Sequence, residues 1–202
     1  MATVDVLIAG HVEETEAGDS VHPTVSLVRD GDLVVVVDPG ILSDPALLTD
    51  ALTGHELGVG DVTHVFVTHH HLDHTRNIGM FPTAVVVDVD SVYDGSLWLG
   101  HDGDGYHLSD DVWVIETPGH ARECAALVVR TADGTVVLTH AWWFADMTPE
   151  EDPLAWDQAT LDRSRARVLA IADVVVPGHG PAFRPGHGSA SRPAGNIHRG
   201  EN

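Results

Sequence analysis

The chain has 202 residues, of which 43% are hydrophobic, and this length and composition fit one globular domain with a sizeable core. Aspartate and glutamate outnumber lysine and arginine by 31 to 10, and the formal net charge is -21. Because nucleic acids and anionic lipid surfaces are bound by basic patches, neither partner is expected. A single cysteine, Cys124, excludes an internal disulfide.

The first ten residues carry Asp5 and no basic segment, and their apolar run is short. No stretch of the chain approaches the ~18 apolar residues of a membrane span. We therefore expect a cytoplasmic protein without a membrane partner. Its oligomeric state is left open.

Short runs rich in valine, leucine and threonine predict strands along most of the chain. They lie at residues 4–9, 24–29, 33–38, 62–68, 83–87, 112–116, 125–130, 135–139 and 173–176. The second and third runs flank Asp30-Gly31-Asp32, and the seventh and eighth flank Ala132-Asp133-Gly134. Both connectors have the Asp and Gly residues of hairpin turns, so these two pairs are predicted to be antiparallel.

Two helices are predicted between these strands. One follows Asp44-Pro45 through Leu52, and the other runs from Asp152-Pro153 to about Ala170, with Asp152 as N-cap and Leu154 on its apolar face. The order of elements predicts an α+β protein with helix, sheet, sheet and helix layers. We expect residues 1–184 to form this domain and residues 185–202, rich in Gly, Ser, Arg and Pro, to form a flexible tail.

A dense group of histidines follows the fourth predicted strand, in the sequence Thr68-His69-His70-His71-Leu72-Asp73-His74. Alternation along an extended segment puts His69 and His71 on one side, and a helix that begins near Asp73 turns Asp73 and His74 inward. Burying these polar side chains without a partner is costly, so coordination explains them better than a structural role does. Imidazole and carboxylate donors predict one or two divalent metal ions, with zinc as first candidate and iron or manganese as alternatives.

Two further histidines end strands in the same manner. His120 closes Thr117-Pro118-Gly119-His120, and His179 lies in Pro177-Gly178-His179-Gly180-Pro181. Either residue alone is more often a hydrogen-bonded core histidine than a ligand. Beside the first cluster, both become candidate ligands.

The pattern His-x-His-x-Asp-His, a later Gly-His after a strand and a Gly-His-Gly near the end together resemble the metallo-β-lactamase superfamily over roughly residues 1 to 184. Three stretches, at 68–82, 112–120 and 172–184, also resemble one narrower group within it. The resemblance implies a four-layer αββα sandwich with the site along one edge of its two sheets. Asp38, which ends a strand before Pro39-Gly40, matches an aspartate that in the family orients a ligand.

The same resemblance implies how the ligands divide between two metals. One metal is held by His69, His71 and His120. The other is held by Asp73, His74 and His179.

The chain departs from the superfamily at one position. Dinuclear members carry an aspartate that bridges both metals where this chain reads Thr139-His140-Ala141. A carboxylate offers one oxygen to each cation, whereas a neutral imidazole offers a lone pair to only one. His140 then binds one metal, or the second site is weakened, or His140 lines the pocket. We include His140 among the metal ligands and leave Asp146 out.

These ligands predict a metal-dependent hydrolase acting on a small molecule. A bound dication lowers the pKa of water toward ~7, so that a metal-bound hydroxide attacks an ester, thioester, lactone or amide. Asp73, which orients the nucleophile and accepts its proton, and His140 are the candidate catalytic residues. Two alternatives remain: an iron-dependent oxidative enzyme on the same fold, and a non-catalytic metal-binding protein.

Aromatic and basic side chains near these motifs suggest how a substrate is held. Trp142 and Trp143 directly follow His140 and are predicted to wall the pocket mouth. For the remaining candidates we favour core packing or solvated charge over contact with a substrate. These are Trp98, Phe144, Arg122 and Arg184.

Overall fold

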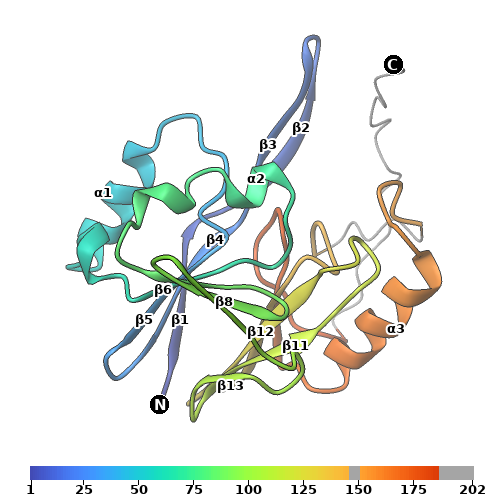
Figure 1. Ribbon diagram of the computed structural model, residues 1–202. Coiled ribbons are helices and arrows are strands. Elements are labelled where there is room, and N and C mark those ends of the chain that lie inside the picture. Colours follow the sequence, from blue (N-terminus) through green and yellow to red (C-terminus); the bar gives the residue numbers. More distant parts are fainter. Residues whose placement is uncertain (146–150, 187–202) are drawn as a thin grey trace.

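The computed structural model describes residues 1–145 and 151–186 (Figure 1). Its helices are α1 (Ala46–Gly54), α2 (Leu72–Thr75) and α3 (Gln158–Leu169), with 3-10 turns at η1 (Val59–Asp61) and η2 (Ile78–Met80). The strands in the first half are β1 (Thr3–Ile8), β2 (His11–Thr15), β3 (Gly18–His22), β4 (Val25–Asp30), β5 (Leu33–Val37), β6 (His64–Phe66) and β7 (Val85–Val87). The remaining strands are β8 (Ser91–Asp94), β9 (Leu97–Gly100), β10 (His107–Ser109), β11 (Val112–Glu116), β12 (Ala125–Thr131), β13 (Gly134–Thr139) and β14 (Val174–Val176).

Two mixed sheets form the body of the molecule. One has seven strands in the order β1-β4-β5-β6-β7-β8-β9, and the other has five in the order β10-β11-β12-β13-β14. The pairs β5–β6, β6–β7 and β13–β14 are parallel. Strands β4–β5 and β12–β13 pair in antiparallel fashion, which confirms both predicted hairpins.

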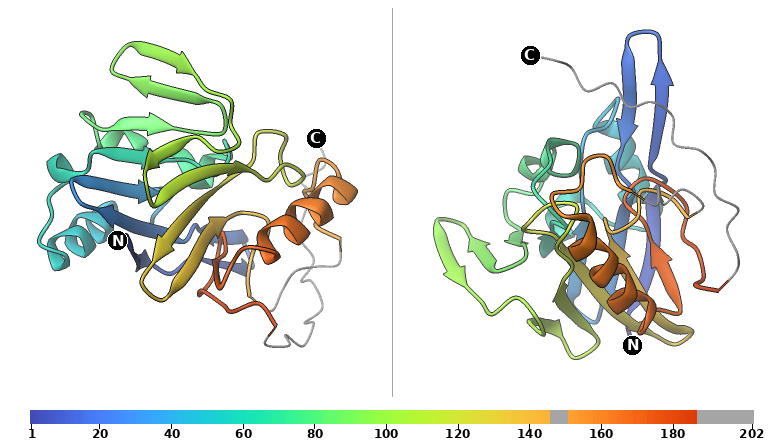
Figure 2. Two further views of the ribbon diagram at one scale, coloured as in Figure 1. Left: turned by 90° about the horizontal axis from the view of Figure 1, so that it is seen from below. Right: turned by 90° about the vertical axis from the view of Figure 1, so that its right-hand side faces the viewer.

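Three separate cores account for four layers, as the αββα prediction requires. The two sheets face each other across a core that includes Val35 of β5 and Leu127 of β12. The outer face of the seven-stranded sheet packs on α1 through Val36 and Leu48, and the outer face of the five-stranded sheet packs on α3. Neighbouring residues on one strand therefore enter different cores, because side chains alternate across a strand. The two turned views show α1 and α3 on opposite outer faces of the pair of sheets (Figure 2).

The prediction for the last helix is wrong at its start. The helix begins at Gln158 rather than near Pro153, and its N-cap is Asp157, whose side chain accepts a hydrogen bond from the Thr160 amide at 2.6 Å. Leu154 lies before the helix and is 44% exposed, so it is not part of the buried face. Asp152 has other partners, described below. The buried positions of α3 follow helical spacing at Leu161, Ser164, Arg165 and Val168.

An antiparallel ribbon of β2 and β3 was not predicted. It is paired only with itself and projects from the body beside α2 (Figure 1). Its sequence is rich in acidic residues and its exposed tip lacks a run of apolar residues. The apolar periodicity on which strand prediction depends is therefore missing. Strands β8, β9 and β10 were missed as well, because each has only three or four residues and is too short to show a clear alternation.

Two further predictions concern a membrane span and the C-terminal tail. Within residues 1–145 and 151–186, no helix is long and apolar enough to cross a membrane. The predicted flexible tail falls outside the described residues from position 187 onward, so it stays a prediction.

Candidate metal centre

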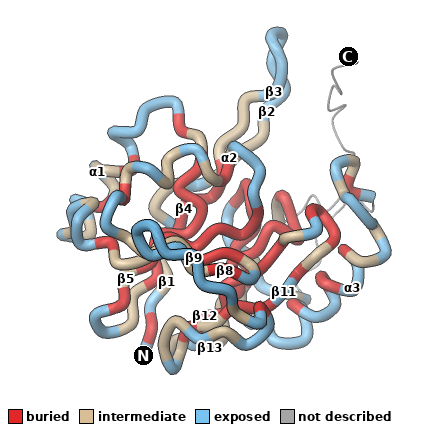
Figure 3. Tube along the Cα trace, viewed as in Figure 1, coloured by how far each residue is buried: buried red, intermediate tan, exposed pale blue. Residues whose placement is uncertain are grey.

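The candidate ligands come from loops that follow strands of both sheets. His69, His71, Asp73 and His74 lie after β6 and at the start of α2. His120 follows β11, His140 follows β13 and His179 follows β14. Figure 3 shows that the buried part of the chain follows these strands and continues into the loops beyond them. The loops of two sheets therefore meet at one edge, which is a rigid place for a site.

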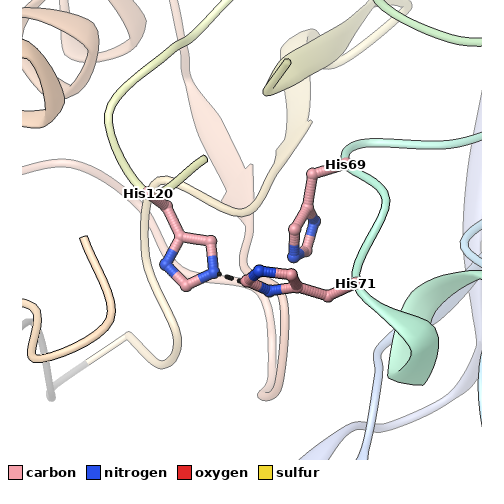
Figure 4. Close-up of side chains that lie close together, drawn as sticks. All are labelled: His69, His71 and His120. Carbon is pink, nitrogen blue, oxygen red and sulfur yellow. Dashed lines mark hydrogen bonds between the residues drawn. The ribbon is translucent and has the colours of Figure 1, made fainter. Parts of the chain in front are cut away.

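The structure brings all seven candidate ligands together. They form three overlapping groups whose donor atoms lie within 4.8 Å of one another. The groups are His69 with His71 and His120; Asp73 with His74 and His179; and His69 with His74 and His140. Figure 4 shows the rings of the first group turned toward one another, with His120 Nε2 at 3.2 Å from His71 Nδ1.

Unpartnered nitrogens show that the residues present fit a metal ion. His69 Nε2, His74 Nε2 and His140 Nδ1 are buried and have no hydrogen-bond partner among the residues that the structure describes, with Asp73 Oδ2 at 3.4 Å from His74 Nε2. Their side chains are 0%, 0% and 3% exposed. A buried polar atom without a hydrogen-bond partner lowers the free energy of unfolding by about 1 to 3 kcal/mol. A divalent cation accepts imidazole lone pairs and removes this cost for the nitrogens that face it.

Asp38 orients two of the histidines, in agreement with the role expected for it. Its Oδ2 accepts a hydrogen bond from His74 Nδ1 at 2.8 Å, which leaves Nε2 of His74 as the free donor atom. The same oxygen accepts from the Thr68 hydroxyl, and that hydroxyl oxygen lies 3.1 Å from His69 Nδ1. Asp38 has a φ of 49°, in the left-handed region that aspartate tolerates better than most residues.

Asp152 holds a third histidine, a role that the sequence did not reveal. Its Oδ2 accepts hydrogen bonds from His120 Nδ1 at 2.8 Å and from Trp143 Nε1 at 3.1 Å. The other oxygen, Oδ1, accepts from the Leu154 amide at 2.9 Å, in a turn that ends before α3 begins. Because Asp152 lies 32 positions from His120 in sequence, no local motif could have linked the two residues.

His140 lies at the centre of the cluster. Its ring centroid is 4.3 Å from those of His69 and His120, 4.6 Å from that of His74 and 5.0 Å from that of His179. The backbone of Gly178 packs directly against it, since a Cβ atom at position 178 would lie 2.0 Å from His140 Nδ1. The ring is therefore held from one side by a residue that must lack a side chain.

Burial and charge set the protonation of the cluster. Burial and the neighbouring histidines lower the pKa values of His69 and His140 well below 6.5, and the same causes lower the pKa of His179 to about 4. Burial disfavours the charged form of His74 as well, but Asp38 and Asp73 outweigh it and raise its pKa to about 9. Burial raises the pKa of Asp73, yet His74 and His179 together lower it to about 2. His69, His140 and His179 are thus neutral at neutral pH, as ligands must be.

A cavity of about 400 Å³ opens onto the cluster. Its walls include His71, Asp73, His120, His140 and His179, together with apolar side chains from several elements. The apolar and aromatic residues are Val12, Val21, Ile41, Leu72, Trp143 and Leu154. A concave, largely apolar pocket with a few convergent polar groups is the usual form of a small-molecule site.

The structure corrects one of the two predicted pocket tryptophans. Trp143 lines the cavity, but Trp142 is 5% exposed and packs in the core between α3 and the five-stranded sheet. The two residues lie in the irregular segment after β13, and their side chains enter different surroundings.

The side chains assigned to core packing or solvent lie outside the cavity walls. Trp98 is 73% exposed on β9, so it is neither core nor pocket wall. Arg122 stacks on Trp156 at 4.5 Å, Arg184 is exposed, and Phe144 packs 6.4 Å from the His179 ring. Asp146 lies outside the described residues.

With this geometry in place, comparison with known proteins defines the class. The sequence model of the metallo-beta-lactamase superfamily matches residues 18–197, so the chain belongs to that superfamily. The fold and the superfamily predicted from the histidine motifs are thereby confirmed.

A narrower likeness is to metallo-beta-lactamase domain-containing protein 1, the group whose motifs the three stretches resembled. The human protein of that name is 41% identical over 157 residues, which cover 74% of this chain and 59% of the human protein. The chain thus matches less than two thirds of the human protein's length.

Solved structures share the fold at low identity. A putative metallo-beta-lactamase from Thermotoga maritima superposes with a TM-score of 0.71 at 20% identity, covering 91% of this chain and 99% of that one. AidC, a dizinc quorum-quenching lactonase in complex with a product, superposes with a TM-score of 0.63 at 14% identity, covering 88% and 81%. At these identities the likeness shows the fold alone.

Proposed function

We propose that this protein is a metal-dependent hydrolase that cleaves a small-molecule ester, thioester, lactone or amide. The observation that carries the proposal is the set of buried, unpartnered imidazole nitrogens beside an apolar cavity. Neither a folding role nor a packing role accounts for them, because each buried unpaired nitrogen costs stability. The dizinc lactonase among the structural neighbours is a precedent for such chemistry on this fold.

The donor groups suggest how two metal ions would be held. His69, His71 and His120 would bind one ion, and Asp73, His74 and His179 the other. His140 forms a third group with His69 and His74, which are assigned to different ions. We therefore treat His140 as a candidate ligand of either ion. Zinc suits this set best among common ions, since imidazole nitrogen and carboxylate oxygen are its usual ligands beside thiolate.

A divalent cation, when bound, supplies Lewis acidity toward a carbonyl oxygen and lowers the pKa of a coordinated water toward ~7. Asp73 is ionised throughout the neutral range, because its pKa is lowered to about 2. A carboxylate of such low pKa is a weak proton acceptor, so we assign Asp73 to binding and orientation, with its Oδ2 at 3.4 Å from His74 Nε2 and 3.6 Å from His179 Nε2. The apolar walls restrict water, which strengthens each polar interaction inside.

Metal content and turnover of matched variants test this proposal. His71 lines the cavity, whereas its neighbour His70 is directed to Asp88, with Nε2 at 3.0 Å from Oδ2. We expect His71→Ala to lose metal and hydrolysis of an ester, thioester and lactone panel, while His70→Ala keeps both. Metal-replete protein that turns over no member of the panel would contradict the proposal. Bound iron with oxygen consumption in its place would indicate oxidative chemistry.

A further inference from the structure

We propose that the ribbon of β2 and β3 makes the pocket selective for substrates with an apolar segment next to the reacting carbonyl and a cationic group further out. This inference rests on the hydrolase function proposed above and names a substrate class for it.

The register assigns each side chain of the ribbon to one of two faces. Val12 pairs with Val21 and Glu14 pairs with Asp19, so these four share one face. The alternate pairs, among them Glu13 with Ser20, occupy the other face. Val12, Val21 and Asp19 all line the cavity, which identifies the first face as the one turned toward the site.

Along this face the character changes from apolar to acidic. The valine pair lies near the base of the ribbon, and the acidic pair lies closer to its exposed tip. Near the valines, Ile41, Leu154 and Trp143 add apolar surface to the cavity. An alkyl or aryl segment of a substrate bound at the metal centre would lie against this surface, and burial of its CH₂ groups would strengthen binding.

The acidic pair, Glu14 and Asp19, favours a cation over an anion at the outer end of the pocket. Neither Glu14 nor Asp19 forms an ion pair with another residue that the structure describes, and no arginine of residues 1–145 or 151–186 lines the cavity. The chain has no lysine, and its formal net charge of -21 adds a field of the same sign. A substrate carboxylate would be repelled here, and an ammonium group would be attracted.

Chelating probes test charge selectivity independently of turnover. We would measure the affinity of the zinc-loaded protein for three hydroxamates that share one alkyl chain and end in a methyl, a trimethylammonium or a carboxylate group. Because the metal-binding head is common to all three, differences in affinity report the outer end of the pocket. We expect the ammonium probe to bind about 10-fold more tightly than the carboxylate probe at low salt, and the ratio to fall as salt screens the acids.

Paired double variants separate a local effect from the general charge of the protein. Glu14→Gln with Asp19→Asn should reduce the ratio to about 2-fold or less. Glu13→Gln with Glu16→Gln removes the same charge from the same ribbon but not from the cavity-facing pair, and should leave the ratio close to that of the unmodified protein. Equal affinities for the charged probes, equal effects of the two double variants, or failure of all three probes to bind would overturn the proposal.

Turnover of the matching esters is measured separately. Hydrolysis without a preference among the esters, together with equal probe affinities, would refute the charge selectivity and leave the hydrolase function intact. Selective binding of the probes without hydrolysis of any ester would support the selectivity and contradict the hydrolase function.

Discussion

The carbonyl oxygen of His22 accepts a hydrogen bond from Nδ1 of His179 at 2.9 Å. A carbonyl can only accept, so His179 carries its proton on Nδ1 and presents Nε2 to the cluster. His22 is the last residue of β3, and His179 follows β14 in the other sheet. The base of the ribbon and a candidate metal ligand are therefore positioned by one bond, which ties the pocket wall to the metal centre.

Removing the charge of Asp38 is expected to weaken metal binding. Asp38→Asn keeps a residue that tolerates the left-handed backbone but removes the negative charge that supports His74 and, through Thr68, His69. Loss of such an orienting carboxylate lowers metal affinity by about 10- to 100-fold. Competition with a chromophoric chelator measures this change. Asp32→Asn, in an exposed hairpin turn, is the control, and an equal loss in both variants would argue against the assignment.

Truncation of His140 distinguishes a ligand from a pocket wall. If the ring binds a metal ion, His140→Ala should lower the affinity for at least one ion by about 10-fold or more, because a first ligand matters at least as much as the groups that orient it. Calorimetric titration of the metal-free protein gives affinity and stoichiometry together. Unchanged affinity and stoichiometry would show that His140 only lines the pocket.

A methyl group at position 178 should displace the His140 ring. Gly178→Ala puts a Cβ atom 2.0 Å from His140 Nδ1, a separation that real contacts never show. We expect weaker metal binding and a free energy of unfolding lower by about 1 to 3 kcal/mol from overpacking. Gly60→Ala is a suitable control because, among the described residues, no atom beyond its own short helical turn and chain neighbours lies within 4 Å of the point that its Cβ atom would occupy. Denaturant unfolding of both variants measures the difference.

The stability of the metal-free protein should depend on pH in two directions. His69, His140 and His179 have folded pKa values below 6.5, so below that pH the unfolded chain binds more protons and stability falls as the pH decreases toward about 4. His74 has a folded pKa of about 9, so its contribution is complete below 6.5 and is lost as the pH rises toward about 9.

Denaturant unfolding across this range, without metal, should therefore give maximal stability close to neutral pH. His179→Gln removes one titrating group and should flatten the acid side of the curve without altering the alkaline side. A profile that rises steadily as the pH decreases below 6.5 would contradict the assigned directions of the pKa shifts.

The histidine motifs and the valine-rich runs were sufficient to predict the superfamily and the layers, and the candidate ligands that they indicate lie together in the structure. Both kinds of signal are local: a run of apolar residues indicates a strand, and a histidine directly after such a run, as at His69, or after a Gly that follows it, as at His120 and His179, indicates a candidate ligand. The start of α3 was misplaced because Asp152 satisfies the local rule for an N-cap equally well, whereas in the structure its carboxylate bonds His120, Trp143 and the Leu154 amide ahead of the helix.

By itself, the amino-acid sequence determined which residues have the chemistry to bind a metal and most of the segments that form the two sheets, because these properties belong to individual residues and to their spacing. Only the tertiary structure decided that Asp152 holds His120, that Gly178 packs against His140 and that the acidic face of the ribbon looks into the cavity. The first two relationships join segments that are far apart in the chain. The third depends on which face of the ribbon is directed toward the cavity. Such pairings follow from the packing of the whole fold, and no local pattern of residues encodes them.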